Sequence, residues 1–589
     1  MSLVKVLGVL AAVAVTVLSE SGPRDRSFRL PDHFKPVQYD VHLTYNTAKG
    51  AGPHDGVVKL HFKLVKAPPK PELYLHANEL DVLSATLCSS TEGACNGQPL
   101  DIKNDRNKFA VLLSVKQGLA NHFANLDDQT YAIEVKFRWR VRQSGGASRG
   151  GAFRSRGKYY AITQGEQIGM RKIFPCMDEP QLKAHFQTTI TVLHRDNDDY
   201  PAVSNMPVKK TIKGSGKTTT VFEKTPPMST YLVAFAIPQG RYKKGVTTKG
   251  KTMQSTVYGS SFGGKRVGVY VTRAVDFFNN YFGAVDPLPK IDYATNRDFL
   301  AMENWGMIYG ASSRSVVLHE VAHAWFGDQV TCDWWRDIWL NEGWTAYATA
   351  LSLSPLGYGN TARQLRSLSS SVARRYRNYA TPLQSDRFYI DMFTGGQLVY
   401  SKGGAIARMV AEMVGGIPGS GKRIGQYLLS KRFQNHNSQS LAKGLANGDA
   451  LIEEAIVDFS TLGGLPRINI RFDSSRKEFV VTQSSQLSRK PNQRWTIPIF
   501  YSINGNKVQT PAMFPKAQKE LRLPLKAGTS ASSYKFNPNM EVPMSVTGTF
   551  NFRDAAEDRF DYVSDAEVEA EPEPTFLPPW IQNLKADDE

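Results

Sequence analysis

The segment HEVAH places two histidines four positions apart, at His319 and His323. In an α-helix this spacing turns both imidazoles toward nearly the same face. Two imidazoles on one face can bind a single zinc ion when a third ligand comes from elsewhere and one coordination position stays open for water. Glu342 is the natural third ligand, because it lies on the next segment with helical spacing, IWLNEGWTAYATA. These residues predict a zinc site with one ion per chain.

Glu320 directly follows the first histidine, and its helical position turns it toward the bound water rather than toward the metal. A carboxylate there can accept a proton as the water attacks a carbonyl group. Either Asp333 or Asp337 is expected to orient one of the histidines, and the sequence does not choose between them.

A chance occurrence of the HEVAH pattern on an exposed helix is disfavoured, because the residues that flank it are apolar. The histidines and Glu320 would therefore be buried, and buried ionisable groups need partners. The apolar residues are Val316, Val317, Val321, Ala322, Trp325 and Phe326.

The periodicity of apolar residues predicts a multidomain α+β protein. Residues 23–240 alternate apolar and polar side chains in short runs such as VQYDVHLTY, which is typical of an all-β domain. Residues 241–465 change to longer runs with helical spacing, after extended segments near their start. Residues 466–550 return to alternation and predict a small β-sandwich. The segment 551–589, which is rich in acidic residues, is expected to be a disordered tail.

The N-terminus combines Lys5 with a run over residues 7–18 that is apolar except for Thr16. That run is shorter than the roughly 20 apolar residues that a membrane-spanning helix needs, and it suits the core of a signal peptide. We therefore predict a signal peptide over residues 1–22 and a secreted protein without a later membrane-spanning helix. The alternative is a short uncleaved anchor, which would keep the protein associated with a membrane.

The four cysteines fit an oxidising compartment without requiring one. Cys88 and Cys95 flank the polar loop CSSTEGAC and could close a small disulfide. Cys176 and Cys332 lie in apolar surroundings, so we expect both to be buried free thiols.

The formal net charge of +18 raises the question of a nucleic acid partner. The basic residues are scattered over predicted strands and loops, which is typical of a solvated surface. No nucleic-acid-binding motif accompanies them, so we expect no such partner. A hydrophobic fraction of 41% and a charged fraction of 21% also describe an ordinary globular protein rather than a fibrous one.

HEVAH, the segment WLNEGW and the upstream AMENWG together resemble the zinc aminopeptidases related to aminopeptidase N, which are gluzincins. The resemblance implies an N-terminal β-sandwich domain and a thermolysin-like catalytic domain. In that family a glutamate of the AMEN segment binds the free amino group of the peptide, a role that falls here on Glu303. A carboxylate that pairs with an α-ammonium makes the site read the chain end, as an exopeptidase does. Ala301 and Met302 would line the pocket for the first side chain.

Two further segments extend the resemblance. Residues 163–186 are similar to the family segment that reaches over the active site, which implies that Gln164 faces the first substrate residue and that Glu166 shares the ammonium with Glu303. A structural ion pair is the alternative role for Glu166. The segment GQLVYSKGGAIARMV resembles the family's tyrosine-bearing helix, so Tyr400 would donate a hydrogen bond to the oxyanion. Without the resemblance, such a tyrosine is an ordinary core residue.

The chain departs from the family pattern in three places. Leu300 stands where the family has glycine, and its side chain could narrow the substrate groove. The connection between Glu303 and His319 is shorter than in relatives, which could pull the substrate-binding strand out of register. We also expect a shortened form that lacks the large C-terminal helical domain of many relatives and therefore has a more open site.

The expected function is a secreted zinc aminopeptidase that hydrolyses the N-terminal bond of peptides with a free amino group. Two alternatives remain open. A zinc endopeptidase or an epoxide-hydrolase-like relative could use the same ligands. A catalytically impaired peptide-binding homologue could keep the metal while the short connection before His319 displaces the amine site. The preferred N-terminal residue and the oligomeric state do not follow from the sequence.

Overall fold

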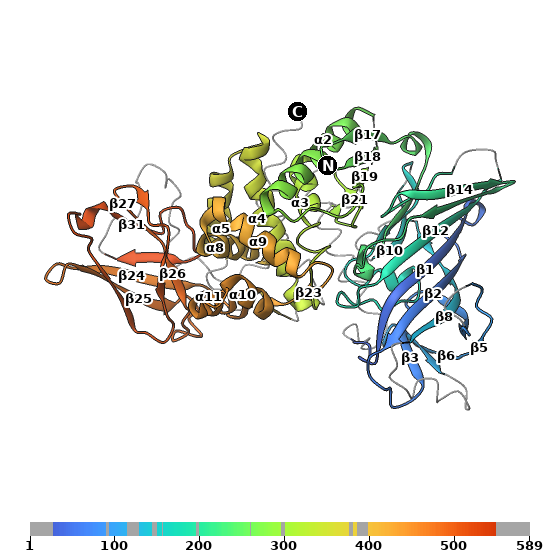
Figure 1. Ribbon diagram of the computed structural model, residues 1–589, viewed down its shortest axis with the longest axis horizontal. Helices are drawn as coiled ribbons and strands as arrows, with labels where there is room; N and C mark the ends of the chain where they lie inside the picture. Colours follow the sequence, from blue (N-terminus) through green and yellow to red (C-terminus); the bar gives the residue numbers. More distant parts are fainter. Residues whose placement is uncertain are drawn as a thin grey trace. The chain divides into compact units, whose positions relative to one another are not determined.

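The computed structural model describes residues 28–89, 93–114, 129–143, 150–155, 157–195, 200–259, 261–295, 301–375, 381–385 and 398–548. The chain divides into two compact units (Figure 1). The first unit comprises Met1–Lys249, Met253–Val269 and Leu288–Ser312, and the second comprises Gly250–Thr252, Tyr270–Pro287 and Ser313–Glu589. Each unit is described separately below.

The first unit is built on an eight-stranded sheet. Its alternation is clearest in β1, where Tyr39, Val41, Leu43 and Tyr45 are buried and the side chains between them are more exposed. In spatial order the strands are β14 (Val208–Gly214), β15 (Lys217–Phe222), β12 (His185–Leu193), β1 (Phe34–Asn46), β2 (His54–Leu64), β8 (Thr130–Trp139), β4 (Asp81–Leu87) and β5 (Gln98–Pro99). β1 pairs with β12 in parallel, and β1, β2 and β8 pair successively in antiparallel register.

Three further sheets complete the first unit. One contains β13 (Val203–Ser204), β16 (Phe235–Pro238), β11 (Tyr159–Gln164), β10 (Gly151–Ser155) and β9 (Val141–Arg142). A second contains β3 (Glu72–His76), β7 (Ala110–Ser114) and β6 (Asp101–Asp105). The third contains β17 (Val246–Lys249), β18 (Gln254–Tyr258), β19 (Asp292–Thr295), β21 (Met307–Gly310) and β20 (Ala301–Met302).

The connection that leads to the HEVAH segment is short and ordered. β20 pairs with β21 in antiparallel register, with Ala301 opposite Gly310 and Met302 opposite Tyr309. The chain then enters α3 (Arg314–Ala322) only a few residues later. The strand that precedes Glu303 is therefore formed and paired, although the connection is short. Leu300 lies outside the described residues.

The second unit is mostly helical before residue 465. Among its described residues, the helices are the end of α2 (Ser261–Phe282), α3, α4 (Trp339–Leu356), α5 (Thr361–Arg375), the π-helix η9 (Leu398–Lys402), α8 (Gly403–Met413), α9 (Gly416–Ser430), α10 (Ser438–Ala446) and α11 (Ala450–Thr461). A small parallel pair joins β22 (Thr331–Cys332) to β23 (Asn435–His436). In the described parts of both units, short 3₁₀ turns span Thr47–Lys49, Met170–Lys172, Thr230–Leu232, Gly240–Lys243, Trp335–Asp337 and Ala531–Ser533.

The last described part of the second unit consists of strands in three sheets. The first sheet contains β30 (Glu520–Pro524), β25 (Glu478–Ser485), β24 (Pro466–Asp473) and β32 (Ser545–Gly548). The others contain β26 (Ile497–Ile499) with β29 (Ala512–Phe514), and β28 (Asn506–Lys507) with β27 (Tyr501–Ile503) and β31 (Tyr534–Phe536).

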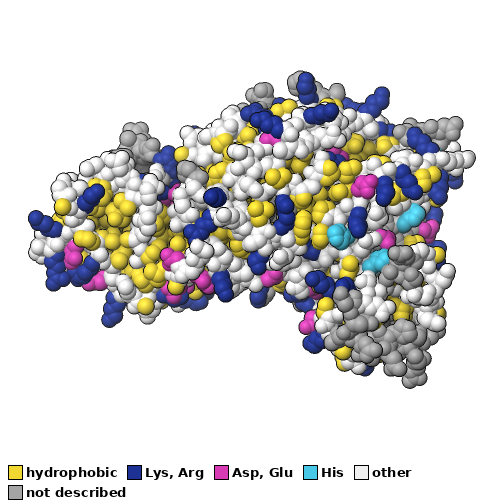
Figure 2. All heavy atoms as spheres, in the orientation of Figure 1, with side chains coloured by type: hydrophobic (Ala, Val, Ile, Leu, Met, Phe, Trp, Pro, Cys, Tyr) yellow, Lys and Arg dark blue, Asp and Glu magenta, His cyan; other side chains and the backbone are white. Residues whose placement is uncertain are grey.

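The predicted order of a β-rich region followed by a helical region is confirmed. The Cys88–Cys95 disulfide is present, and Cys176 and Cys332 are buried free thiols, as predicted. Figure 2 shows lysine and arginine side chains spread over the visible face rather than gathered in one area. Among the described residues, no helix is both long and apolar enough to span a membrane. The predicted signal peptide and the acidic tail lie outside the described residues.

A buried ion pair organises the segment that carries Gln164 and Glu166. Arg171 Nε donates to Asp178 Oδ2 at 2.9 Å, and Arg171 Nη2 donates to the Asp178 carbonyl oxygen at 3.0 Å. Both side chains are 1% exposed. Burial raises the pKa of Asp178 in spite of the adjacent guanidinium, so this carboxylate depends on Arg171 to remain ionised.

We predict that Arg171→Met lowers the free energy of unfolding by about 3–5 kcal/mol, because it leaves a buried carboxylate without its counter-charge. Arg140→Met is the matched control, since Arg140 Nη2 pairs with Asp81 Oδ2 at 2.7 Å with both side chains nearly half exposed. That surface pair should contribute less than about 1 kcal/mol. Denaturant unfolding measures both values, and equal effects of the two substitutions would contradict this account.

Candidate metal centre

The helix that carries the histidines is buried on all sides. α3 runs from Arg314 to Ala322, and each residue from Val316 onward is buried. A helix that is apolar around its whole circumference belongs in a protein interior. The α-helix ends one residue before His323, but that residue keeps helical backbone angles and its N–H donates to the His319 carbonyl at 3.3 Å. The two imidazoles therefore still project from the same face.

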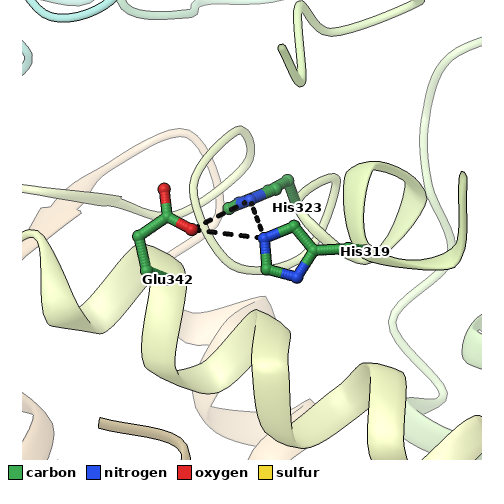
Figure 3. A group of neighbouring side chains, drawn as sticks. All are labelled: His319, His323 and Glu342. Atoms are coloured by element: carbon green, nitrogen blue, oxygen red, sulfur yellow. Dashed lines mark hydrogen bonds and ion pairs between the residues drawn. The ribbon is translucent and has the colours of Figure 1, made fainter. Parts of the chain in front are cut away.

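His319, His323 and Glu342 converge at one point in the interior of the second unit (Figure 3). Glu342 Oε2 lies 3.2 Å from His319 Nε2 and 3.5 Å from His323 Nε2. The two Nε2 atoms lie 3.2 Å from each other. None of the three side chains is more than 4% exposed. His319 lies on α3, His323 directly follows this helix, and Glu342 lies on α4.

These separations fit a zinc ion. Ligand atoms bound to one zinc at about 2.0–2.1 Å in a tetrahedron lie about 3.3 Å apart. Two imidazole nitrogens and one carboxylate oxygen also form the donor set of many catalytic zinc sites, with a fourth position left for water. The residues present therefore suit the metal in both donor type and spacing.

The protonation states in this group also favour metal binding. Burial lowers the pKa of His319 to about 4, although Glu342 acts in the opposite direction. Burial alone would favour the protonated form of Glu342, but His323 and His319 outweigh it and lower the pKa of this carboxyl. At neutral pH His319 is uncharged and Glu342 is ionised, which are the forms that coordinate a metal.

His323 is oriented by a carbonyl and a threonine. Its Nδ1 donates to the Phe326 carbonyl oxygen at 3.0 Å, and Thr345 Oγ1 lies 3.2 Å from the same nitrogen. Because a carbonyl can only accept, Nδ1 carries the proton and Nε2 presents its lone pair toward Glu342. Thr345 lies three residues after Glu342 and so shares its helix face. The spacing of three residues between Glu342 and Thr345 is the sequence signal by which this threonine could have been identified.

The prediction that Asp333 or Asp337 orients a histidine is wrong. Asp333 accepts a hydrogen bond from Asn437 Nδ2 at 2.8 Å. Asp337 accepts from the backbone N–H of Ser438 at 3.1 Å and from Gln384 Nε2 at 3.0 Å. Both carboxylates instead connect this loop to α10 and its N-cap.

Glu320 and Tyr400 lie beside the candidate ligands. Glu320 is buried on α3, and one of its carboxylate oxygens lies within 4.8 Å of a ring nitrogen of His323. The Tyr400 ring centroid is 5.6 Å from that of His319. Tyr400 lies on the π-helix η9 rather than on a regular α-helix, a distortion that is frequent at functional sites.

Several aromatic side chains close in the sequence to the candidate ligands are buried and packed together. Phe326 stacks on Trp344 with ring centroids 5.5 Å apart, and Trp325 packs 5.3 Å from Phe278. Trp339 is also fully buried. Such packing excludes water and so strengthens the electrostatic interactions among the polar groups.

The candidate substrate-binding residues all lie in the first unit. Gln164 is the last residue of β11, and Ala301 and Met302 form β20. Gln164 and Glu303 are both about 3% exposed. One carboxylate oxygen of Glu166 lies within 4.8 Å of one of Glu303, so these two acids form a pair.

The turn after Glu303 is held by groups that the sequence did not indicate. Asn205 Nδ2 donates to the Trp305 carbonyl at 2.8 Å, and Lys290 Nζ donates to the Gly306 carbonyl at 2.9 Å. Gly306 has a φ of +84°, and a Cβ there would lie 2.2 Å from the Asn205 carbonyl oxygen. Only glycine fits this position in the AMENWG segment.

Lys402 is a buried ammonium group two residues after Tyr400. Its Nζ donates to the Leu462 carbonyl at 3.1 Å, and the side chain is 2% exposed. Burial lowers its pKa to about 7. Above this pH the folded chain holds Lys402 mostly as a neutral amine, whereas the unfolded chain keeps it charged up to about pH 10.

Between about pH 7 and pH 10 the unfolded state binds one more proton at Lys402 than the folded state does. Lys402 therefore makes the free energy of unfolding rise with pH by up to about 1.4 kcal/mol per pH unit. Below about pH 7 both states are protonated and the effect is constant. We predict that the unfolding free energy of the wild type relative to Lys402→Met rises between about pH 7 and pH 10. The control Lys249→Met, at an exposed position on β17, should show no such rise. A difference in unfolding free energy between the wild type and Lys402→Met that does not change with pH would contradict the lowered pKa of Lys402.

Comparison with known proteins agrees with this arrangement. Residues 35–232 match the Peptidase M1 N-terminal domain, and residues 270–460 match the Peptidase family M1 domain. The chain is 29% identical to a glutamyl aminopeptidase of Bitis rhinoceros over 82% of its own length and 52% of that protein.

Two further relatives show the same level of similarity. The human glutamyl aminopeptidase is 28% identical over 84% of this chain and 54% of that protein. Aminopeptidase 2, mitochondrial, of Saccharomyces cerevisiae is 28% identical over 84% of this chain and 53% of that protein. The chain thus spans about half the length of the curated relatives it matches. With both of its characteristic domains matched in order, the chain belongs to peptidase family M1.

Proposed function

We propose that this protein is a zinc-dependent aminopeptidase that removes the N-terminal residue of peptides. The observation that carries this proposal is the convergence of His319, His323 and Glu342 with Glu320 beside them. Membership of family M1 and the aminopeptidase names of the relatives support the same reaction class.

One zinc ion per chain would be held by Nε2 of His319, Nε2 of His323 and a carboxylate oxygen of Glu342. Zinc bound there would supply Lewis-acid chemistry, which polarises a scissile carbonyl and lowers the pKa of a water molecule. Glu320 accepts the proton that the attacking water releases and then returns it to the leaving amine. The Tyr400 hydroxyl donates a hydrogen bond to the carbonyl oxygen as negative charge develops on it.

Selection of the peptide N-terminus is assigned to the first unit. Glu303 and Glu166 form a carboxylate pair that would bind an α-ammonium, and two acids favour a full positive charge more strongly than one. Gln164 would contact the first residue of the peptide, while Ala301 and Met302 would line its side-chain pocket. The turn held by Asn205 and Lys290 supports this assignment, because it fixes the backbone next to Glu303.

The finer domain plan is also a proposal. The predicted domains are residues 23–240, 241–465 and 466–550, with a thermolysin-like arrangement in the second and a small β-sandwich in the third. Fully buried residues of the last region, including Ile468, Ile470 and Phe479, support an apolar core between its sheets. The Cys88–Cys95 disulfide supports a secreted protein, because disulfides persist in oxidising compartments.

We predict that the purified protein holds about one zinc per chain and that Glu342→Gln removes most of it. Thr345→Val should weaken zinc binding by about 10–100-fold, the range for partners that orient a ligand. Asp333→Asn is the matched control, because this carboxylate contacts Asn437 and no histidine. Competition with a chromophoric chelator measures all three variants. Equal losses for Asp333→Asn and Thr345→Val would contradict the assigned support of His323.

We expect the zinc-loaded protein to cleave a panel of aminoacyl amides that includes glutamyl and aspartyl substrates. Chelation should abolish cleavage and added zinc should restore it. Glu320→Gln should keep its zinc and lose about 10²–10⁴-fold in kcat, the usual contribution of a general base. Glu303→Ala should mainly raise KM, because it removes a binding partner of the substrate amine.

N-acetylated versions of the same substrates provide the control for exopeptidase action. An aminopeptidase should lose nearly all activity on them, because the blocked amine cannot pair with Glu303 and Glu166. Equal cleavage of blocked and free peptides would identify an endopeptidase instead. Full zinc content without turnover of any free-amine substrate would identify a peptide-binding homologue.

A further inference from the structure

Two helices of the second unit touch backbone to backbone at a pair of glycines. A Cβ built on Gly343 of α4 would lie 2.6 Å from both Cα and C of Gly403 at the start of α8. A Cβ built on Gly403 would lie 2.9 Å from the Gly343 Cα. Both clashes are with main-chain atoms, so no side-chain rotation can relieve them. Helices crossing through ordinary side chains keep their axes about 8–10 Å apart, and only glycine allows this closer approach.

Each glycine of the crossing lies close in the sequence to a group of the proposed active site. Gly343 directly follows Glu342, and Gly403 lies three residues after Tyr400. The distance between the two helices at this point therefore sets how far Tyr400 lies from the candidate metal ligands. A Cβ on either glycine would force the backbones apart by about 1 Å, a displacement that can reduce catalysis about 100-fold.

α8 is buried along its whole length and is held by contacts with later parts of the chain. Arg408 Nη1 donates to the Met540 carbonyl at 3.0 Å, and Arg408 Nη2 donates to the Asn539 carbonyl at 2.8 Å. Lys507 Nζ pairs with Glu412 Oε2 at 2.7 Å. Lys402 also ties the preceding turn to the Leu462 carbonyl. These contacts hold the helix against β28 and against the turn between β31 and β32, so added bulk at the crossing must displace the groups next to it.

We propose that Gly343 and Gly403 are positioning residues that set the separation between the metal-binding carboxylate of Glu342 and the hydroxyl of Tyr400. This inference rests on the proposed function. We expect substitution of each glycine to have a distinct effect. Gly343 is next to the proposed metal ligand Glu342, and Gly403 is near the proposed hydrogen-bond donor Tyr400.

The test uses Gly343→Ala, Gly403→Ala and the double variant in the full chain. Zinc affinity, kcat and KM are measured for each, together with the denaturation midpoint of the zinc-free protein. We expect Gly343→Ala to weaken zinc binding by about 10–100-fold, as loss of ligand support does. Gly403→Ala should lower kcat by about 100-fold with KM and zinc affinity changed less than about threefold.

Two other helical glycines serve as matched controls. A Cβ on Gly404 would meet only side-chain atoms, from Ala346 and Leu368 at 3.3 Å, and a Cβ on Gly419 of α9 would meet nothing within 4 Å. Gly404→Ala and Gly419→Ala should therefore stay within about twofold of the wild type in zinc affinity and kcat. If Gly404→Ala and Gly419→Ala had effects as large as those of Gly343→Ala and Gly403→Ala, the proposal would be overturned. The losses would then follow from replacing any helical glycine and not from this crossing.

The double variant tests the contact itself. The first added methyl group already separates the helices, so the second should lower the denaturation midpoint of the zinc-free protein by much less than it does alone. Additive midpoint shifts would show that the glycines do not share a contact, and they would overturn the proposal. This comparison needs no zinc and no substrate, so it holds even if the wild type lacks aminopeptidase activity.

A variant whose added atoms first meet side chains covers the case in which the alanine substitutions prevent folding. Gly404→Leu places a larger side chain against Ala346 of α4 and against Leu368, and it separates α8 from α4 without a direct clash between main chains. We expect lower kcat in this variant. Wild-type kcat and zinc affinity in folded Gly404→Leu would overturn the proposal. Failure of the proposed function would appear differently, as a wild type that binds zinc but cleaves no aminoacyl amide.

Discussion

The convergence of two imidazoles and a carboxylate in a buried interior is the constraint on which the second unit depends. Polar groups with so little exposure are costly to bury unless partners compensate them. Their mutual contacts meet part of that cost, and a divalent cation of the right size would meet the remainder. The apolar character of α3 and the tryptophans around it follow from the same requirement, because water in this space would weaken each of these interactions.

α4 concentrates three different duties in its first turns. Glu342 faces the imidazoles, the next residue is the glycine that allows α8 to approach, and Thr345 supports the orientation of His323. These duties do not conflict, because successive positions on a helix point in different directions and positions three apart share a face. Further along the chain, the turn between β31 and β32 holds α8 through Arg408, and β28 holds it through Lys507.

The sequence predicted the features that depend on local periodicity. The spacing of His319 and His323 is sufficient to place both rings on one face, and helical spacing after them identified Glu342. The sequence could not predict contacts made by the tertiary fold. A backbone carbonyl has no sequence signature, so the partner of His323 at Phe326 was missed and aspartates were named instead. The meeting of Gly343 with Gly403 joins segments far apart in the chain, and no local pattern encodes it.

The place of each ligand along its helix has an electrostatic consequence. His323 stands just past the last residue of α3, at the helix end where the aligned peptide dipoles give about half a negative charge. Glu342 lies in the first turn of α4, where the same alignment gives about half a positive charge. One helix terminus would thus attract a cation while the other stabilises the anionic carboxylate, so the backbone itself would contribute to holding a metal ion here.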